Sequence, residues 1–545
     1  MSYHWSMLHG KLNFRSGGAS LEEKIVDEEK KKKKRTPSFI AEFPLRVTAA
    51  DERELGIRME AARHEYNASL GEALRIVDLM KASKEWQAAR KLPGGSKEHK
   101  KAKHEAFDVV KKVFGFTQSV IQKFAEGCRD SCWIGDHMGS HDTQTISLRA
   151  FRAAEQYVFG KRGRPRFKGY RSLHSVEGKG DAVLRFRVVD GVPSILWAGL
   201  SLPLMLDPRD RDGWQAEALK CRTKYVRVLR RNLRGTVRWY GQLSQEGRPP
   251  QKAQHPVGVG VVGLDLGPST IAVVGQDSAS LETFCATLDV PEAKIRRLQR
   301  AMDRSRRGTN PEAYNADGTC KKGVRIKVRS RRYLNLCAEK ANVERCLAAE
   351  RKRAHGELAN RVLSLGDIIK TEKLSYRSFQ KNFGRSVQRR APSMFVSMLK
   401  RKAASAGAST IEFKTRTTCL SQYDHISGTY KKIPLSQRYH EFPDGSRAQR
   451  DLYSAWLARY VQQDNLDASQ LANDWVAAEP LLQQAASSFH QSARGHGLPI
   501  PHALQGRQSR SPATGESPAC RGCGGVAARR EPQIDKWLIP RTPRL

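Results

Sequence analysis

The chain of 545 residues contains no uninterrupted run of about 18 apolar residues, the length that a membrane-spanning helix needs. Its N-terminus opens with polar residues, so the apolar core of a signal peptide is also missing. Its ten cysteines are scattered without the spacing of a disulfide scaffold, which agrees with a reducing compartment. We therefore expect a cytoplasmic protein with no membrane partner.

Acidic residues are scarce relative to basic ones. The chain has 56 Asp and Glu against 96 Lys and Arg, which gives a formal net charge of +40. An excess of this size disfavours self-association and favours a polyanionic partner. Because the excess extends over most of the chain and no basic amphipathic helix stands out, nucleic acid is a better candidate than a membrane surface.

The length allows two to four domains. A polar N-terminal segment ends in five lysines and Arg35 and cannot fold by itself. Pro249-Pro250 marks a linker, and the tail with the lone pair Cys520 and Cys523 is expected to be disordered. These features predict a flexible basic arm (1–36), a nucleic-acid-binding region (37–250), a second folded region (251–465) and a C-terminal helix with a disordered tail (466–545).

Apolar periodicity predicts several long elements. Helical spacing extends over residues 51–80, 97–124 and 333–365. Strand-like runs lie around residues 183–189, 194–206 and 225–240. The stretches 294–307 and 321–332 are strongly basic, and we expect both to be helical faces along a nucleic-acid channel, with contacts from Arg296, Arg297 and Arg300.

One acidic residue lies inside the most apolar part of the chain. The small and β-branched residues of 257–274 predict a buried hairpin that a Gly-Pro pair breaks. Asp265 is expected just before the turn, on the pleat face of Val257, Val259 and Val261. A carboxylate there is costly unless a positive group meets it, so the pattern suggests half of a metal site.

Two further acids lie where a shared site needs them. Glu372 ends a short predicted strand, and Asp451 lies in the first turn of a predicted helix. Carboxylate oxygens suit Mg²⁺ or Mn²⁺, and two such ions can stabilise the attacking and leaving oxygens of phosphodiester hydrolysis. Like charges at close range raise one another's pKa, so the site should bind metal or protons. Spacing alone does not single out these three among 56 acids.

A basic loop combines cations with aromatic rings. Cations can pair with phosphates while rings stack on bases, whereas the alternative is an ordinary exposed loop. The candidate nucleic-acid contacts in this loop are Lys161, Arg162, Arg164, Arg166, Phe167 and Lys168.

The order of these motifs resembles that of the transposon-encoded TnpB proteins and their relatives, the compact type V CRISPR effectors, over residues 150–465. The shared order is a basic Arg-Pro-Arg-Phe-Lys loop, Gly-Leu-Asp-Leu-Gly around Asp265, a long basic helical insert, Glu-Lys-Leu from Glu372, Thr-Cys at Cys419, and Arg-Asp-Leu-Tyr-Ser-Ala around Asp451. The resemblance implies a multidomain α/β protein with an RNase H-like (RuvC) nuclease domain over 251–465. It also implies an N-terminal β-barrel wedge with a helical recognition insert.

The resemblance further implies the activity and partners. It assigns catalytic metal-ligand roles to Asp265, Glu372 and Asp451, with guide RNA and target DNA as partners and a nucleoid-associated location in a prokaryote. The expected activity is RNA-guided, metal-dependent cleavage of DNA. A catalytically silent guided DNA-binding protein and a strand-transferring transposase are the alternatives, and the number of chains in the active particle stays open.

One departure from the family concerns zinc. The family has a zinc ribbon with two Cys-x-x-Cys pairs before the last Asp. Here the ribbon region, about 415–448, keeps one of those thiols, Cys419. A site of Cys419, His425 and His440 is conceivable, but we expect both histidines to be surface residues and zinc to be absent. The ribbon would then be held by apolar contacts of Tyr423, Ile433, Leu435, Tyr439 and Phe442.

Overall fold

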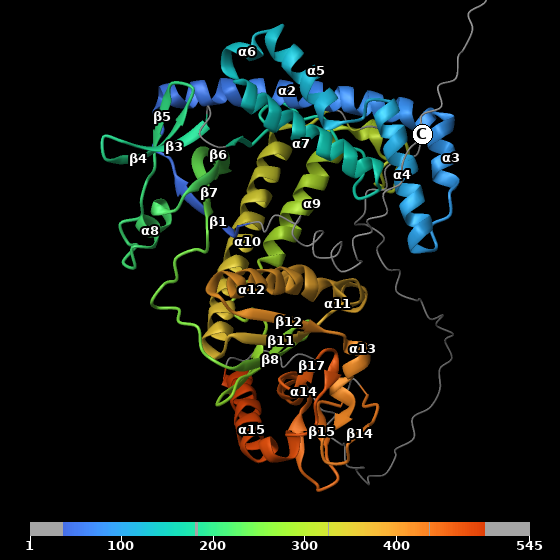
Figure 1. Cartoon of the computed structure of the whole chain (residues 1–545), viewed down its shortest axis with the longest axis vertical. Coiled ribbons are helices and arrows are strands. Elements are labelled where there is room, and N and C mark those ends of the chain that lie inside the picture. The colour runs from blue at the N-terminus through green and yellow to red at the C-terminus, as the bar shows by residue number, and fades with distance from the viewer. Residues whose placement is uncertain (1–35, 180–183, 325, 327, 435–436, 496–545) are drawn as a thin grey trace, which may run out of the picture.

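The computed structural model describes residues 36–179, 184–324, 326, 328–434 and 437–495. The predicted N-terminal arm up to residue 35, Leu435 and the tail pair Cys520 and Cys523 lie outside these residues. The described chain mixes helices and strands in several layers, as the sequence predicts (Figure 1). None of its helices is long and apolar enough to cross a membrane.

The first half of the chain surrounds an antiparallel sheet in the order β1-β7-β6-β2. Its strands are β1 Ser38–Pro44, β2 Ser175–Lys179, β6 Thr223–Leu233 and β7 Thr236–Glu246. Between β1 and β2 the chain inserts a group of helices packed on the long helix α2 (Figure 1). These helices are α2 Ala49–Ala82, α3 Lys84–Lys91, α4 Lys97–Val113, α5 Gln118–Asp130, α6 Ile134–His137 and α7 Ser140–Val158.

A smaller sheet follows in the order β3-β4-β5. Its strands are β3 Leu184–Val189, β4 Val192–Trp197 and β5 Leu200–Pro203, and helix α8 Trp214–Lys220 comes next. The bridge between Leu45 and Leu204 joins the two sheets, and one apolar core packs both of them and the helical insert. The helical insert is present, whereas closure into the predicted barrel stays a prediction, as do the domain boundaries.

The second half contains a five-stranded sheet in the order β10-β9-β8-β11-β12. Strands β8, β9 and β10 form an antiparallel meander, and β11 and β12 run parallel to β8. The strands are β8 Val261–Leu266, β9 Thr270–Val274, β10 Ala279–Thr283, β11 Ile368–Glu372 and β12 Ser409–Phe413. The meander confirms the predicted hairpin, but the strand starts at Val261, and Val259 is 90% exposed instead of lying on its pleat face.

Helices cover both faces of this sheet (Figure 1). One face packs on α10 Arg331–Leu365 and α12 Pro392–Ala406, and the other on α14 Arg450–Ala458 and α15 Leu471–Gly495. Helix α9 Glu292–Thr309 packs on α10. The remaining helices are α11 Tyr376–Arg390 and α13 Thr415–Thr418, and two 3₁₀ turns lie at Pro311–Ala313 and Leu420–Gln422.

The ribbon region folds as two hairpins with short strands. The first pairs β13 Tyr423–Asp424 with β14 Thr429–Tyr430, and the second pairs β15 Tyr439–Glu441 with β16 Arg447–Gln449. A third small pair, β17 Val461–Gln462 and β18 Asn465–Leu466, follows α14.

Several predicted elements are divided in the structure. The single helix predicted over 97–124 is wrong, because Gly115 has a φ of 67° and Thr117 caps a new helix. The run 194–206 is two strands, since Ala198 and Gly199 form a turn with φ values of 43° and 88°. The helix predicted over 321–332 is also wrong: its described residues before Ser330, the N-cap of α10, form no helix.

Helix α14 approaches β8 so closely that only a glycine fits at the contact. A Cβ on Gly263 would lie 1.9 Å from the carbonyl oxygen of Ala455. A Cβ added to Gly258 or Gly366 would likewise collide with a backbone carbonyl oxygen, that of Ser364 or of Gly260, where the start of the strand passes the end of α10. The register of helix and strand is therefore fixed by backbone contact.

We expect Gly263→Ala to lower the melting temperature, because the new methyl group must displace α14 at a cost of about 1–3 kcal/mol or more. Gly356→Ala is the matched control, since it lies within helix α10 and a Cβ there meets nothing within 4 Å. Scanning calorimetry should show a loss for Gly263→Ala and no loss for Gly356→Ala. Equal melting of both variants would contradict the close packing.

Candidate active site and nucleic-acid interface

Asp265 lies in β8 one residue before its end. It pairs across the hairpin with Ala272, and the turn closes where the Gly267 N–H donates to the Thr270 carbonyl at 2.9 Å. Neighbouring residues Leu264 and Leu266 are buried on one face of the strand, so alternation points Asp265 to the other face, toward α14. As a whole residue Asp265 is half-buried.

Glu372 ends the neighbouring strand β11. The two strands are parallel, and Thr371 pairs with Leu264, so the next position along each strand holds Glu372 and Asp265. The two strands are neighbours in the sheet, which is the condition that a shared site of these acids requires. Glu372 is partly exposed, whereas Thr371 beside it is buried.

Asp451 comes from the first turn of α14, which crosses the strand ends. The side chain of Gln449 caps this helix by accepting a hydrogen bond from the Leu452 N–H at 2.8 Å. The Thr270 hydroxyl donates to the Asp451 carboxylate at 3.4 Å, which ties the helix to the hairpin of Asp265. The Asp451 side chain is 14% exposed.

Lys370 anchors the far end of the same helix to the sheet. Its ammonium group donates to the carbonyls of Arg459 and Val461, both at 2.8 Å. Burial lowers the pKa of Lys370, and the charge of Arg459 lowers it further. Since Lys370 lies two residues before Glu372 on β11, the strand that carries one acid also holds the helix that carries another.

Asp451 and Glu372 act electrostatically on Asp265. Burial raises the pKa of Asp265 well above its usual range, and the charges of Asp451 and Glu372 raise it further, against the opposing charge of Arg450. Burial raises the pKa of Glu372 to about 7, although a hydrogen bond from Thr415 lowers it. Both shifts favour a site that takes up protons or a cation, as the sequence predicts.

The donor chemistry of this cluster suits a hard divalent cation, because all three side chains offer carboxylate oxygens. As the side chains stand, however, no three His, Cys, Asp or Glu groups within the described residues are placed to hold one metal ion. The shared element ends, with parallel β8 and β11 side by side and α14 packed on β8, bring the three backbone positions to one end of the sheet. The backbone brings the acids together, and the rotamers do not close the site.

Two arginines lie beside Asp451 that the sequence analysis did not single out. The Arg450 Nε is 3.7 Å from a carboxylate oxygen of Asp451. Burial lowers the pKa of Arg438, while the charge of Asp451 raises it. The Nε of Arg438 is buried without a hydrogen-bond partner among the described residues. Arg450 is adjacent to Asp451 in sequence and could have been noticed, whereas Arg438 reaches the site only through the hairpin fold.

The two histidines of the ribbon region are packed in an aromatic cluster, so their expected surface position is wrong. His440 is 2% exposed, and the His425 Nδ1 lies 3.0 Å from the Tyr453 hydroxyl. The His425 ring lies 4.4 Å from that of Trp475. A neutral imidazole ring carries no charge that must stay in water, so these rings can be buried among the apolar residues of the hairpins. The thiol of Cys419 donates to the carbonyl of Arg416 at 3.4 Å.

The predicted basic loop lies against α2 with most of its side chains exposed. The Lys168 N–H donates to the Asn67 side chain at 2.7 Å, which fixes the loop backbone. Phe167 is 60% exposed, as a ring available for stacking must be. Arg164 makes a two-pronged ion pair with Asp78 at 2.8 and 2.9 Å, so this cation anchors the loop. Lys161, Arg162 and Arg166 are also exposed.

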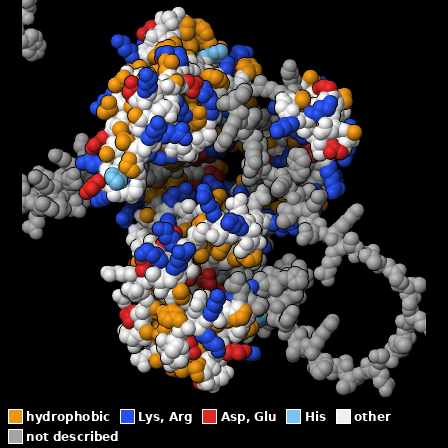
Figure 2. All heavy atoms as spheres, turned by 90° about the vertical axis from the view of Figure 1, so that its right-hand side faces the viewer, with side chains coloured by type: hydrophobic (Ala, Val, Ile, Leu, Met, Phe, Trp, Pro, Cys, Tyr) orange, Lys and Arg blue, Asp and Glu red, His pale blue; other side chains and the backbone are white. Residues whose placement is uncertain are grey.

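Arg296, Arg297 and Arg300 are exposed on α9, as predicted, and Arg296 lies 3.4 Å from Glu292. A further basic cavity of about 1020 Å³, which no sequence motif indicates, lies between the first sheet and helices α10 and α12. Its cations come from both halves of the chain, namely Arg231, Lys252, Arg345, Lys352, Arg401 and Lys402. Lys and Arg side chains also line a hollow between the two halves in Figure 2.

Glu42 is the acid among the residues that line this interdomain cavity. Burial opposes its ionisation, but hydrogen bonds from Arg231 and Gln242 and the charges of Arg231 and Lys352 lower its pKa. The carboxylate is thus neutralised by Arg231, and the other cations remain in excess. A cavity of this size and charge suits a polyanion.

No protein-family model matches the chain, and no curated protein matches it. Among solved structures, a cryo-EM structure of a Cas12f1–sgRNA–target DNA complex aligns with a TM-score of 0.38 and 12% identity, over 77% of this chain and 98% of that one. A cryo-EM structure of a CRISPR–Cas12f ternary complex aligns with a TM-score of 0.24 and 14% identity, over 75% of this chain and 82% of that one. Scores this low leave the fold of the chain to be argued from its own topology.

The raised pKa of Glu372 predicts a pH-dependent stability in the absence of metal. A carboxyl group whose folded-state pKa is raised contributes stability below its unfolded value of 4.5, and this is lost as pH rises through about 7. We therefore expect the melting temperature of Glu372→Gln to rise increasingly above that of the wild type between pH 5 and 8 in EDTA. At pH 8 its free energy of unfolding should be about 1–3 kcal/mol higher.

Glu105→Gln is the control for this measurement, because the Glu105 side chain is 65% exposed on α4. Its melting temperature should follow that of the wild type across the same pH range. If Glu372→Gln and the wild type keep a constant difference from pH 5 to 8, the electrostatic strain at the acid cluster is not present.

Proposed function

We propose that the chain is an RNA-guided, metal-dependent DNA endonuclease with a RuvC-like nuclease domain of the RNase H fold. The observation that carries the proposal is the meeting of Asp265, Glu372 and Asp451 at one end of a mixed five-stranded sheet. Burial and the charges of Asp451 and Glu372 raise the pKa of Asp265, and a divalent cation would remove the cost of ionising it. The strand order, with a meander followed by two parallel strands, supports the same assignment.

In this proposal each residue has a stated role. Asp265 and Glu372 hold the ions from adjacent strands, and Asp451 completes the ligand set from the helix. Bound Mg²⁺ or Mn²⁺ supplies an activated water and stabilises the leaving oxygen of the cut phosphodiester. Arg438 and Arg450 place positive charge beside Asp451, where a phosphate of the DNA strand would enter.

The guide RNA and the target DNA are proposed from the resemblance of the motifs and from charge. The net charge of +40, the basic loop on α2, the arginines of α9 and the interdomain cavity supply phosphate contacts. These contacts are sequence-independent, so base pairing with the guide would select the target. The association with a transposon rests on the motif resemblance alone.

A catalytically silent guided DNA-binding protein is the second candidate. The side chains of the described residues do not form a ready metal site, and the hairpins lack the thiols of the family's zinc ribbon. Such a protein would keep the basic surfaces and bind guided DNA without cutting it.

The test is to purify the full chain, sequence the RNA that accompanies it, and incubate the complex with a plasmid that matches that RNA. We expect cleavage in Mg²⁺ or Mn²⁺ that stops in EDTA and in Asp265→Ala. Asp444→Ala is the matched control, because Asp444 lies in the exposed turn of the second hairpin and should leave cleavage intact.

The outcomes separate the candidate functions. Guided binding without product in either metal would favour the silent binder. Strand-transfer products formed without any RNA would establish a transposase. A preparation that carries no defined RNA would overturn the guided nuclease altogether.

A further inference from the structure

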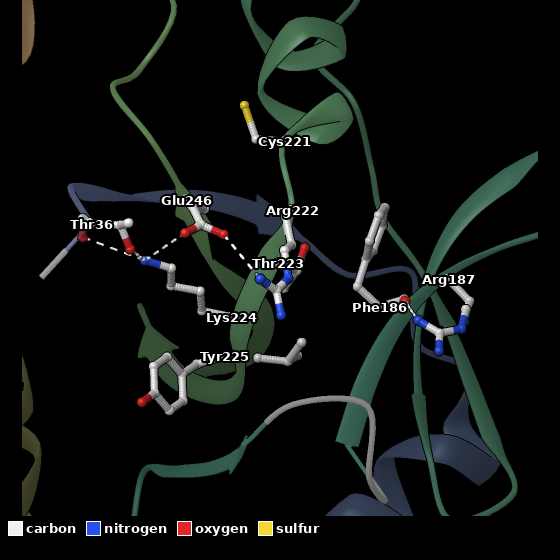
Figure 3. A pocket seen from close by; sticks show the side chains of 10 residues that line it. Thr36, Phe186, Arg187, Cys221, Arg222, Thr223, Lys224, Tyr225 and Glu246 are labelled. Atoms are coloured by element: carbon white, nitrogen blue, oxygen red, sulfur yellow. Dashed lines mark hydrogen bonds and ion pairs between the residues drawn. The ribbon is translucent and has the colours of Figure 1, made fainter. Parts of the chain in front are cut away.

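A second, smaller cavity lies in the first half of the chain, away from the acid cluster and the interdomain cavity (Figure 3). It has a volume of about 580 Å³ and opens where β6 begins, beside β3 and the end of β7. The residues around it are Thr36, Phe186, Arg222, Lys224, Tyr225 and Glu246, with Cys221 at its edge. The basic loop and α9 do not contribute to it.

A β-bulge shapes this cavity. The pairing of β6 with β7 shifts between Thr223 and Tyr225, so Lys224 is the extra residue of the strand. A bulge turns side chains out of the regular alternation and is common beside binding sites. Here it directs Lys224 toward Glu246 and leaves Tyr225 46% exposed on the next position.

The rings and cations of the cavity alternate in space. In Figure 3, Tyr225 and Phe186 lie on opposite sides of Arg222 and Lys224. Phe186 comes from β3 of the small sheet, whereas the other three come from the start of β6 or the residue before it. A single-stranded nucleic acid presents base, phosphate and base in the same alternation, and an aromatic ring and a cation suit each in turn.

The charge of the cavity favours an anion. Arg222 is 83% exposed, and its guanidinium lies 3.4 Å from one carboxylate oxygen of Glu246. Lys224 lies 3.4 Å from the other oxygen. One carboxylate therefore lies beside two cations. The net positive charge remains after Glu246 is counted.

We propose that this cavity binds a short single-stranded segment of nucleic acid, with bases on Tyr225 and Phe186 and a phosphate on Arg222 and Lys224. The inference rests on the proposed function only in that the chain meets nucleic acid, and it needs neither metal nor cleavage. RNA and DNA strands share this chemistry, and the 2′-hydroxyl would decide between them. A duplex keeps its bases stacked on one another and is a poor ligand here.

Cys221 makes the proposal testable, because its partly exposed thiol lies at the cavity. The full chain in EDTA is mixed with ten-nucleotide oligomers of deoxythymidine or uridine, or with a ten-base-pair duplex, and binding is followed by fluorescence anisotropy. Alkylation of Cys221 by iodoacetamide is then measured by mass spectrometry with and without each oligomer. The exposed Cys132 in the helical insert is the internal control.

We expect a saturating single strand to slow alkylation of Cys221 at least about fivefold and to leave Cys132 unchanged. Phe186→Ala with Tyr225→Ala should abolish this protection, and Tyr225→Ala alone should raise the oligomer concentration that half-protects Cys221 about 5- to 100-fold. Arg222→Ala should also weaken the protection of Cys221. Tyr430→Ala, 53% exposed on β14, and Arg75→Ala, ion-paired to Glu72 on α2, are the matched controls and should change neither readout.

Binding without protection of Cys221, or protection that survives in the double variant with an unchanged melting temperature, would overturn the cavity assignment and leave the nuclease proposal standing. Stronger protection by the duplex would also overturn it. Protection in a chain that never cleaves DNA would support the cavity and count against the nuclease. No binding of any oligomer would overturn both.

Discussion

The contact between Gly263 and helix α14 is the constraint on which the candidate site depends. Asp451 reaches Asp265 only because the helix lies directly on the strand, and a single Cβ at Gly263 would fill that space. Lys370 fixes the end of the helix, and Thr270 holds its first turn to the hairpin. The same backbone contact that stabilises the sheet therefore sets the distance between two of the acids.

That closeness has an electrostatic cost, and the surrounding charge limits it. Burial raises the pKa of Asp265 and of Glu372, and the charges of Asp451 and Glu372 raise that of Asp265 further, so the metal-free site favours protons. Arg450 lowers the pKa of Asp265 in opposition. A cation that binds these acids only in the folded state stabilises that state. Occupancy of the site is therefore linked to the free energy of unfolding of the sheet.

The sequence predicted the strand and helix that carry each acid, because apolar runs and a helix N-terminus are local patterns. It could not predict the strand order or the packing of α14, which depend on contacts between residues far apart in the chain. Arg438 and the interdomain cavity were missed for the same reason. Turns at Gly115 and Ala198 divided elements that looked continuous, since apolar periodicity does not register a change of backbone direction.

The ribbon region explains how α14 can be held from its outer side without thiolates. His425 and His440 lie in one cluster with Phe442, Tyr453 and Trp475, and this cluster joins both hairpins to α14 and α15. Ring pairs of this kind contribute about 0.5–1.5 kcal/mol each beyond the area they bury. Burial lowers the pKa of both histidines, which keeps them neutral and packed near neutral pH. Because Tyr453 is two residues from Asp451, packing of the hairpins and packing on Gly263 act on the same turn of helix.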